Sequence, residues 1–224
     1  MSVRSNELHH EGLRSPSQPL QQAHALLRAF RDRSLEYLRR GHDRLSAARF
    51  VVDAADELHG PALDVGTGKG LLAIELARRG MDVVSIDVDD KERELARLLT
   101  EEAGLGGDIN FVNGDAARLS YPDGHFGCVA MMDVMHHLVE PGPVLREMAR
   151  VVRVGGVIII ADFDEDGFEL VSRVHQWEGR EHPRTGATVS LAVDELARAG
   201  FCCTTRTNGH QHDVVVLQKQ LGNL

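Results

Sequence analysis

Cysteine, long apolar runs and positive charge are all scarce in this sequence of 224 residues. It has only three cysteines, Cys128, Cys202 and Cys203, and no CxxC pair. Because an odd number of scattered thiols cannot form a disulfide framework, we expect a reducing compartment. No apolar run approaches the about 20 residues that cross a bilayer, and the opening residues MSVRSNELHH carry no apolar signal segment. These absences predict a cytoplasmic protein without a membrane partner.

The charge balance excludes a further class of partner. The formal net charge is −9, whereas proteins that live on nucleic acid need a basic surface to neutralise phosphates. The twelve histidines are scattered, with no HExxH motif and no Cys/His cluster. We therefore expect no nucleic-acid partner and no metal site, while the sequence leaves open a homodimer.

The hydrophobic content, 42%, is enough for one folded domain with an appendage. Residues 1–19 are polar and rich in serine and proline, which predicts a flexible arm. Residues 20–60 carry two amphipathic helical patterns, separated by Gly41 and with Asp43 as the expected N-cap of the second. We expect these helices to act as a lid over a core domain that spans residues 61–224.

The core region alternates between strand and helix patterns. Short apolar runs that suit fully buried strands occur at 62–65, 83–88, 109–112, 128–132 and 157–161. Helical patterns lie between or after them, at 69–79, 90–103, 115–119, 143–152 and 190–200, with Ser190 as the expected cap of the last. This order predicts an α/β fold with a Rossmann-like, doubly wound, mostly parallel sheet.

The last segment breaks the alternation. Residues 201–207 and 213–219 read as two strands joined by the short loop NGHQH, which predicts a hairpin. The sheet is therefore expected to carry an antiparallel C-terminal hairpin strand at its edge.

The stretch ALDVGTGKG, residues 62–70, holds three glycines at the turn between the first core strand and its helix. Ligands of an open parallel sheet bind at the carboxyl ends of its strands, and glycines let them approach the main chain. A Walker phosphate loop does not fit, because Leu63 stands where its first glycine should be. A dinucleotide fingerprint fits incompletely, because Leu71 occupies its third glycine position.

An acidic residue follows at the end of the second core strand. Asp87 lies 21 residues beyond Gly66, where a carboxylate can accept hydrogen bonds from both hydroxyls of a ribose. Since enzymes that use NAD place an acid similarly, this residue does not by itself decide between cofactors.

Four segments in the same order resemble the class I S-adenosylmethionine-dependent methyltransferases. They are DVGTGKG (64–70), the GDA turn at 114–116 with LSYPDGHF (119–126), MDVMHHLVEP (132–141) and REMARVVRVGGVIIIAD (146–162). The sequence departs from the family pattern at Gly127, where aspartate is usual, and at Val154, where proline is usual. The resemblance covers residues 45–165 closely and the final hairpin in outline.

The resemblance implies S-adenosyl-L-methionine as cofactor, S-adenosyl-L-homocysteine as its product, and a set of residues that contact them. It implies that Asp115 accepts from the adenine amino group and that the backbone N–H of Ala116 meets the ring. The predicted cofactor-binding residues are Asp64, Gly66, Thr67, Gly68, Gly70, Asp87, Val88, Asp115, Ala116, Met131 and Met132.

The acceptor side is less defined by the sequence. His136 and His137 follow the fourth core strand and are weak candidates for a catalytic base. Residues 163–189 form the region that varies in this superfamily, and we expect a substrate loop there. It contains three candidate substrate-binding residues, His175, Trp177 and Arg180.

These features predict an enzyme that transfers a methyl group to a small-molecule acceptor by in-line displacement. The acidic charge and the absence of the NPPY and PC runs of many base methyltransferases favour a small acceptor over nucleic acid. Two alternatives stay open. One is a cofactor-binding sensor or partner subunit without turnover, and the other, which Leu71 disfavours, is an NAD-dependent oxidoreductase.

Overall fold

The computed structural model describes residues 18–221. Its strands are β1 Ala62–Val65, β2 Val83–Asp87, β3 Ile109–Asn113, β4 Phe126–Met132, β5 Val152–Phe163, β6 Phe201–Gly209 and β7 His212–Lys219. Its α-helices are α1 Gln18–Arg39, α2 Arg44–Asp53, α3 Leu71–Arg78, α4 Asp90–Glu102, α5 Pro141–Val151, α6 Glu165–Trp177 and α7 Val189–Arg198, with a short 3-10 helix, η1, at Met135–His137.

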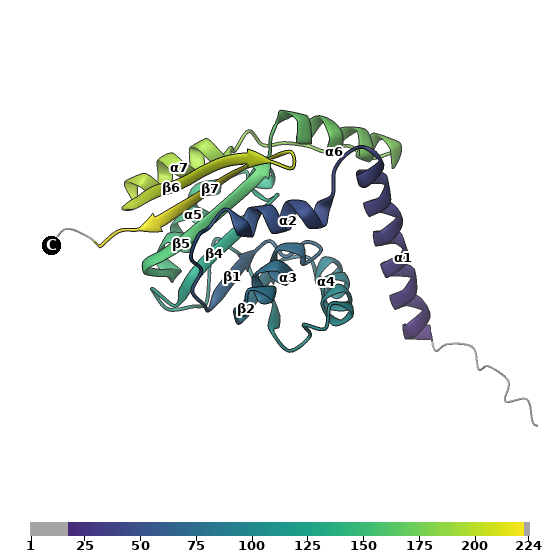
Figure 1. The fold of residues 1–224 in the computed structure, drawn as a ribbon, viewed down its shortest axis with the longest axis horizontal. Coiled ribbons are helices and arrows are strands. Elements are labelled where there is room, and N and C mark those ends of the chain that lie inside the picture. The colour runs from purple at the N-terminus through teal and green to yellow at the C-terminus, as the bar shows by residue number, and fades with distance from the viewer. Residues whose placement is uncertain (1–17, 222–224) are drawn as a thin grey trace, which may run out of the picture.

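All seven strands form one sheet in the order β3-β2-β1-β4-β5-β7-β6 (Figure 1). The first five are parallel, and β7 pairs antiparallel with both β5 and β6. From β1 the chain adds β2 and β3 on one side, then returns to place β4 and β5 on the other side of β1, so the sheet is doubly wound, as the sequence predicted. The expected antiparallel strand lies one position inside the edge, because β6 forms the edge itself.

Two apolar layers enclose the sheet. On one face, α2, α3 and α4 pack their apolar residues against the strands, and on the other face α5 and α7 do so. Strands β1 and β4 are almost wholly buried, as expected for central parallel strands, and apart from Asp64 of β1 their residues are apolar or glycine. The carboxyl ends of β1, β2 and β4 therefore meet at one rim of the sheet, beside which the functional residues gather.

Helix α1 lies outside these layers, beside α4 and the far end of α6 (Figure 1). Only Leu27 and Tyr37 of its 22 residues are buried. The predicted arm over residues 1–19 lies almost wholly outside the described residues. The prediction was wrong for its last two residues, because Gln18 and Pro19 already belong to α1. Proline is well tolerated in the first turn of a helix.

Several local predictions were wrong for identifiable reasons. No helix forms at 115–119, because the side chain of Asp115 accepts the backbone N–H of Ala117 (2.9 Å) and holds a turn. Helix α7 is capped by Thr188, whose side chain accepts from the N–H of Leu191 (3.2 Å), and not by Ser190. The hairpin loop is shorter than expected, because His210 and Gln211 both adopt left-handed φ angles, 51° and 60°, which suit a two-residue turn.

The predicted substrate loop at 163–189 contains a helix, α6, over about half of its length. Asp164 caps α6 by accepting from the N–H of Gly167 (2.8 Å), and the helix runs to Trp177. Val171 and Val174, three residues apart, are its buried face. That spacing, with the acidic cap before it, is a helix signal that the sequence contained.

Candidate functional site

The glycine turn is held in place by the strand beside it. The N–H groups of Gly66 and Thr67 both donate to the carbonyl of Ile86 in β2 (2.9 and 3.0 Å). Gly66, Gly68 and Gly70 all have positive φ angles, which favour glycine. A Cβ on Gly66 would lie 2.4 Å from a methyl of Val134, and one on Gly70 would lie 2.9 Å from Cβ of Ala96.

Gly68 differs from these two glycines. A Cβ placed on Gly68 would meet nothing closer than a backbone oxygen at 3.9 Å, and Gly68 lines an open cavity. The bare main chain is therefore required by the protein's own packing at Gly66 and Gly70. At Gly68 it leaves space for a ligand.

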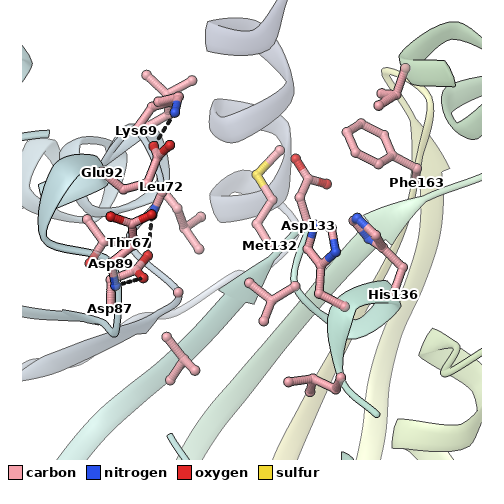
Figure 2. A pocket seen from close by; sticks show the side chains of 18 of the residues that line it. Thr67, Lys69, Leu72, Asp87, Asp89, Glu92, Met132, Asp133, His136 and Phe163 are labelled. Atoms are coloured by element: carbon pink, nitrogen blue, oxygen red, sulfur yellow. Dashed lines mark hydrogen bonds and ion pairs between the residues drawn. The ribbon is translucent and has the colours of Figure 1, made fainter. Parts of the chain in front are cut away.

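The cavity has a volume of about 760 Å³ and lies at the carboxyl ends of β1, β2 and β4. This size is within the range of small-molecule and cofactor sites. Figure 2 shows the residues of the glycine turn, Asp87 and Asp89 on one side, facing Met132, Asp133, His136 and Phe163 on the other.

Asp87 is placed at the end of β2, as the sequence predicted. Its Oδ2 accepts from the N–H of Gly68 and its Oδ1 from the N–H of Asp89, both at 2.9 Å. These bonds fix the carboxylate against the glycine turn, and each oxygen keeps a lone pair for a ligand hydroxyl.

Eight of the predicted cofactor residues line the cavity: Gly66, Thr67, Gly68, Asp87, Val88, Asp115, Ala116 and Met132. The other three are Asp64, Gly70 and Met131, which are not among its lining residues. The difference between the two methionines follows from the period of a strand, because neighbouring side chains point to opposite faces. Met131 is fully buried in the apolar layer of α5 and α7, whereas Met132 borders the cavity.

Asp64 is buried directly behind the glycine turn. Its Oδ2 accepts from the hydroxyl of Ser85 (2.7 Å), and that hydroxyl also bonds the hydroxyl of Thr67 (2.6 Å). Burial, together with the nearby charge of Asp87, raises the pKa of Asp64 to about 7. Asp64 thus supports the turn through Ser85, and it keeps its proton at pH values well above those at which a carboxyl group usually loses it.

At the other end of the cavity, Asp133 has a left-handed φ of 59° and accepts from Nε2 of His212 (2.8 Å). His212 is fully buried, and its Nδ1 bonds the carbonyl of His210 (2.7 Å). Burial alone lowers the pKa of His212, but the charge of Asp133 and the bond to it raise the pKa above its ordinary value. Burial raises the pKa of Asp133, but His212 outweighs it and lowers that pKa. The half-buried Asp133 and the buried His212 form an ion pair that sequence reasoning missed, since 79 positions separate them.

A cluster of histidines completes this end of the cavity. Nδ1 of the buried His136 bonds the carboxylate of Asp162 (2.6 Å), and its Nε2 lies 3.1 Å from Nε2 of His182. His137 also lines the cavity. Burial and the neighbouring ring of His136 lower the pKa of His137, and they lower that of His182 to about 4.

The predicted substrate residues are divided between the cavity and the surface. His175 and Arg180 line the cavity, whereas Trp177 is 64% exposed and is not among the lining residues. His175 Nε2 bonds the guanidinium of Arg33 from α1 (2.8 Å). Four further lining residues, Arg33, Tyr37, His42 and Arg44, come from the N-terminal helices and their connection. No sequence motif identified these four residues.

Comparison with known proteins finds a family match in the middle of the chain. Residues 63–160 match the family described as "Methyltransferase domain". The ubiquinone/menaquinone biosynthesis C-methyltransferase UbiE of Pseudomonas putida (strain GB-1) is 30% identical over 131 residues, which cover 57% of this chain and 51% of that protein. The chain thus spans about half the length of the curated relatives it matches.

Solved structures share the fold at lower identity. PH0226 of Pyrococcus horikoshii OT3 superposes with a TM-score of 0.64 at 22% identity and covers 79% of this chain and 90% of that one. The [4+2]-cyclase SpnF superposes with a TM-score of 0.62 at 18% identity, over 80% of this chain and 83% of that one. None of the described helices is long and apolar enough to cross a bilayer.

Proposed function

Because this chain belongs to the class I S-adenosylmethionine-dependent methyltransferase superfamily, we propose that it transfers a methyl group from S-adenosylmethionine to a small-molecule acceptor. The observation that carries the proposal is the single cavity that joins the glycine turn to the histidine-rich end. One side offers bare main chain and carboxylates for a nucleoside. The other side leaves room for a second molecule.

The proposed cofactor position follows from the chemistry of the cavity wall. Asp87 would accept the ribose hydroxyls, Asp115 would accept the adenine amino group, and Gly68 would let the amino-acid part lie against the main chain. The methyl group of the cofactor is already activated on a sulfonium, so the protein needs only to align the acceptor and exclude water. His136 and His137 stay predictions for a base, which is needed only if the acceptor arrives protonated.

The acceptor itself is not carried over from relatives. The family match ends at residue 160, whereas His175, Arg180 and His182 at the acceptor end come from the chain beyond it. The C-methyl transfer in the name of UbiE therefore describes that protein, while the acceptor of this chain is proposed only as a small molecule. Its segment 163–189 and the N-terminal helices would determine which molecule enters.

Calorimetry with S-adenosylhomocysteine tests the cofactor assignment. We expect one binding site per chain in the wild type and a loss of about 1–3 kcal/mol in Asp87→Ala, because charge-assisted hydrogen bonds to the ribose disappear. Asp82→Ala is the matched control, since Asp82 is exposed and directly precedes the opposite end of β2. Absence of binding at high micromolar concentration in the wild type would contradict the proposal.

A binding protein without turnover is the second candidate, because the fold alone does not establish the reaction. The same fold occurs in a cyclase, so a fold of this kind does not require methyl transfer. The room beside Met132 and the histidines supports turnover, because a sensor needs no acceptor space. Thermal shift with NADH tests the remaining oxidoreductase alternative, for which we expect no stabilisation.

A further inference from the structure

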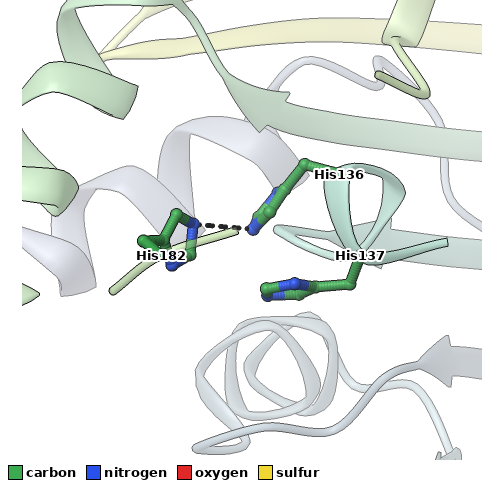
Figure 3. Close-up of side chains that lie close together, drawn as sticks. All are labelled: His136, His137 and His182. Atoms are coloured by element: carbon green, nitrogen blue, oxygen red, sulfur yellow. Dashed lines mark hydrogen bonds between the residues drawn. The ribbon is translucent and has the colours of Figure 1, made fainter. Parts of the chain in front are cut away.

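Three histidines at the acceptor end of the cavity are close enough to share one ion. One ring nitrogen from each of His136, His137 and His182 lies within 4.8 Å of the others (Figure 3). His136 and His137 belong to η1 after β4, and His182 comes from the segment after α6. The fold thus brings together residues that are 46 positions apart, which is why the sequence predicted no metal site.

The spacing of the two closest nitrogens matches a metal site. In a tetrahedral zinc site with Zn–N bonds of 2.0–2.1 Å, two ligand nitrogens are about 3.3–3.4 Å apart. The Nε2 atoms of His136 and His182 are 3.1 Å apart. Since two lone pairs repel each other at this distance, either a proton or a metal ion must lie between these atoms.

The ring of His136 is oriented as metal-binding histidines usually are. Its Nδ1 bonds Oδ1 of Asp162 (2.6 Å), and Oδ2 of the same carboxylate accepts the backbone N–H of His136 (2.8 Å). A carboxylate behind a histidine fixes the tautomer and directs the other nitrogen to the metal. Asp162 is itself buried, which keeps this orientation rigid.

We propose that His136, His137 and His182 bind a divalent transition-metal ion of the zinc class, with a fourth coordination position open to the cavity. His136 is buried, His182 is half-buried and His137 is exposed, so the ligands enclose the ion from one side only. Three protein ligands with an open position are typical of catalytic metal sites, whereas structural zinc sites have four.

The charges around the cluster are compatible with a cation. Arg33 and Arg180 line the same end, but both pair with the carboxylate of Glu178. The carboxylate of Asp162 bonds the ring of His136 and supplies negative charge directly behind this ligand. If the proposed methyl transfer also holds, a hydroxyl group of the acceptor in the open position would be oriented by the ion, which would also make it easier for that O–H group to lose its proton to solvent before the oxygen attacks the methyl group.

A titration with Co²⁺ tests the site, because four-coordinate Co²⁺ absorbs visible light far more strongly than the hydrated ion. The full chain is freed of metal with a chelator and titrated, and Zn²⁺ is then added to displace Co²⁺. We expect one equivalent with the strong absorption in the wild type, and its loss in His182→Gln. His59→Gln, an exposed histidine before β1, should match the wild type.

A second variant examines the positioning residue. Asp162→Asn should weaken the Co²⁺ affinity by roughly 10–100-fold while the absorption of the bound ion is retained. Circular dichroism and S-adenosylhomocysteine binding are measured on each variant, so that a folding defect or a failed cofactor assignment is seen separately. The proposal is overturned if the wild type shows no strong Co²⁺ absorption, which would leave a proton between the two rings. It is equally overturned if His182→Gln binds as tightly as the wild type.

Discussion

At the scale of single residues, the glycine turn separates two reasons for lacking a side chain. The sequence alone suggested that all of its glycines make room for a ligand. In the structure, Gly66 is required because Val134 occupies the space of a Cβ, whereas Gly68 borders the cavity with space to spare. The sequence pattern identifies the glycine positions of the turn. The role of each glycine depends on how residues distant in sequence, such as Val134, pack against it.

We expect Gly66→Ala to destabilise the protein more than Gly68→Ala. Both positions have positive φ angles, 81° and 48°, which cost an alanine roughly 1 kcal/mol. Only the new methyl at position 66 overlaps Val134, at 2.4 Å. Urea unfolding of both variants, and of Gly66→Ala combined with Val134→Ala, measures the difference. Equal losses for both glycines, or no relief from Val134→Ala, would show that this overlap is not the cause.

The buried carboxyl of Asp64 predicts a pH-dependent stability. Its pKa is about 7 in the folded protein and about 3.9 in an unfolded chain. Between these values the folded state holds one proton more, so the free energy of unfolding falls as pH rises, by up to about 1.4 kcal/mol per pH unit, and levels off above pH 7. Below about pH 4 the group is protonated in both states and contributes no pH dependence.

Urea unfolding from pH 4.5 to 8 checks this expectation. Asp64→Asn should remove that part of the slope, because an amide does not titrate, while Asp82→Asn, on an exposed residue, should keep it. Parallel curves for the wild type and Asp64→Asn would mean that the folded pKa of Asp64 is ordinary.

The residues of the site were predictable where one strand end determines them. The positions of Asp87 and Met132 beside the cavity follow from their places at strand ends, and that of Gly68 follows from its place in the glycine turn. The ion pair of Asp133 with His212 and the meeting of His136 with His182 were not predictable, since each joins segments far apart in the chain. No local pattern encodes such pairs, because the long-range path of the chain produces them.

At the scale of elements, the parallel strands and their helices were predictable because burial on both faces leaves a clear apolar pattern. Element ends were less predictable. Helix α7 begins at the cap Thr188, two residues before Ser190, and α6 replaced an expected loop. At α7, Thr188 and Ser190 are both residues that can cap a helix, and the structure uses Thr188. At α6, the cap Asp164 and the spacing of Val171 and Val174 were present in the sequence but were not interpreted as a helix.

Helix α1 is the element we propose as a lid. It has few buried residues, yet Arg33 bonds His175 (2.8 Å) and pairs with Glu178 (3.1 Å) from the far end of α6. An element with so little packing opens easily, and its closure over a bound cofactor would order it.

Hydrogen exchange of backbone amides checks this role. We expect α1 to exchange faster than α7 in the free protein, and to slow on addition of S-adenosylhomocysteine. Helix α7 packs on the other face of the sheet and contributes no residue to the cavity lining, so its exchange should stay unchanged. Arg33→Ala should reduce the slowing, since the bonds to α6 are lost. If the glycine turn slows with ligand while α1 does not, α1 is not a lid.

At the scale of the whole molecule, the doubly wound sheet brings its strand ends to one rim, and the cavity lies there. This arrangement was predictable from the alternation of strands and helices. The shape of the acceptor end was not, because it depends on how α1 and the segment after α6 fold back over that rim (Figure 1).

A crystal structure of the full chain with S-adenosylhomocysteine tests the central claim most directly. The account predicts the ribose hydroxyls on Asp87, the adenine beside Asp115 and Ala116, and the sulfur near Met132 with open space toward His136. A product molecule bound elsewhere, or a cavity that stays empty at saturating concentration, would contradict it.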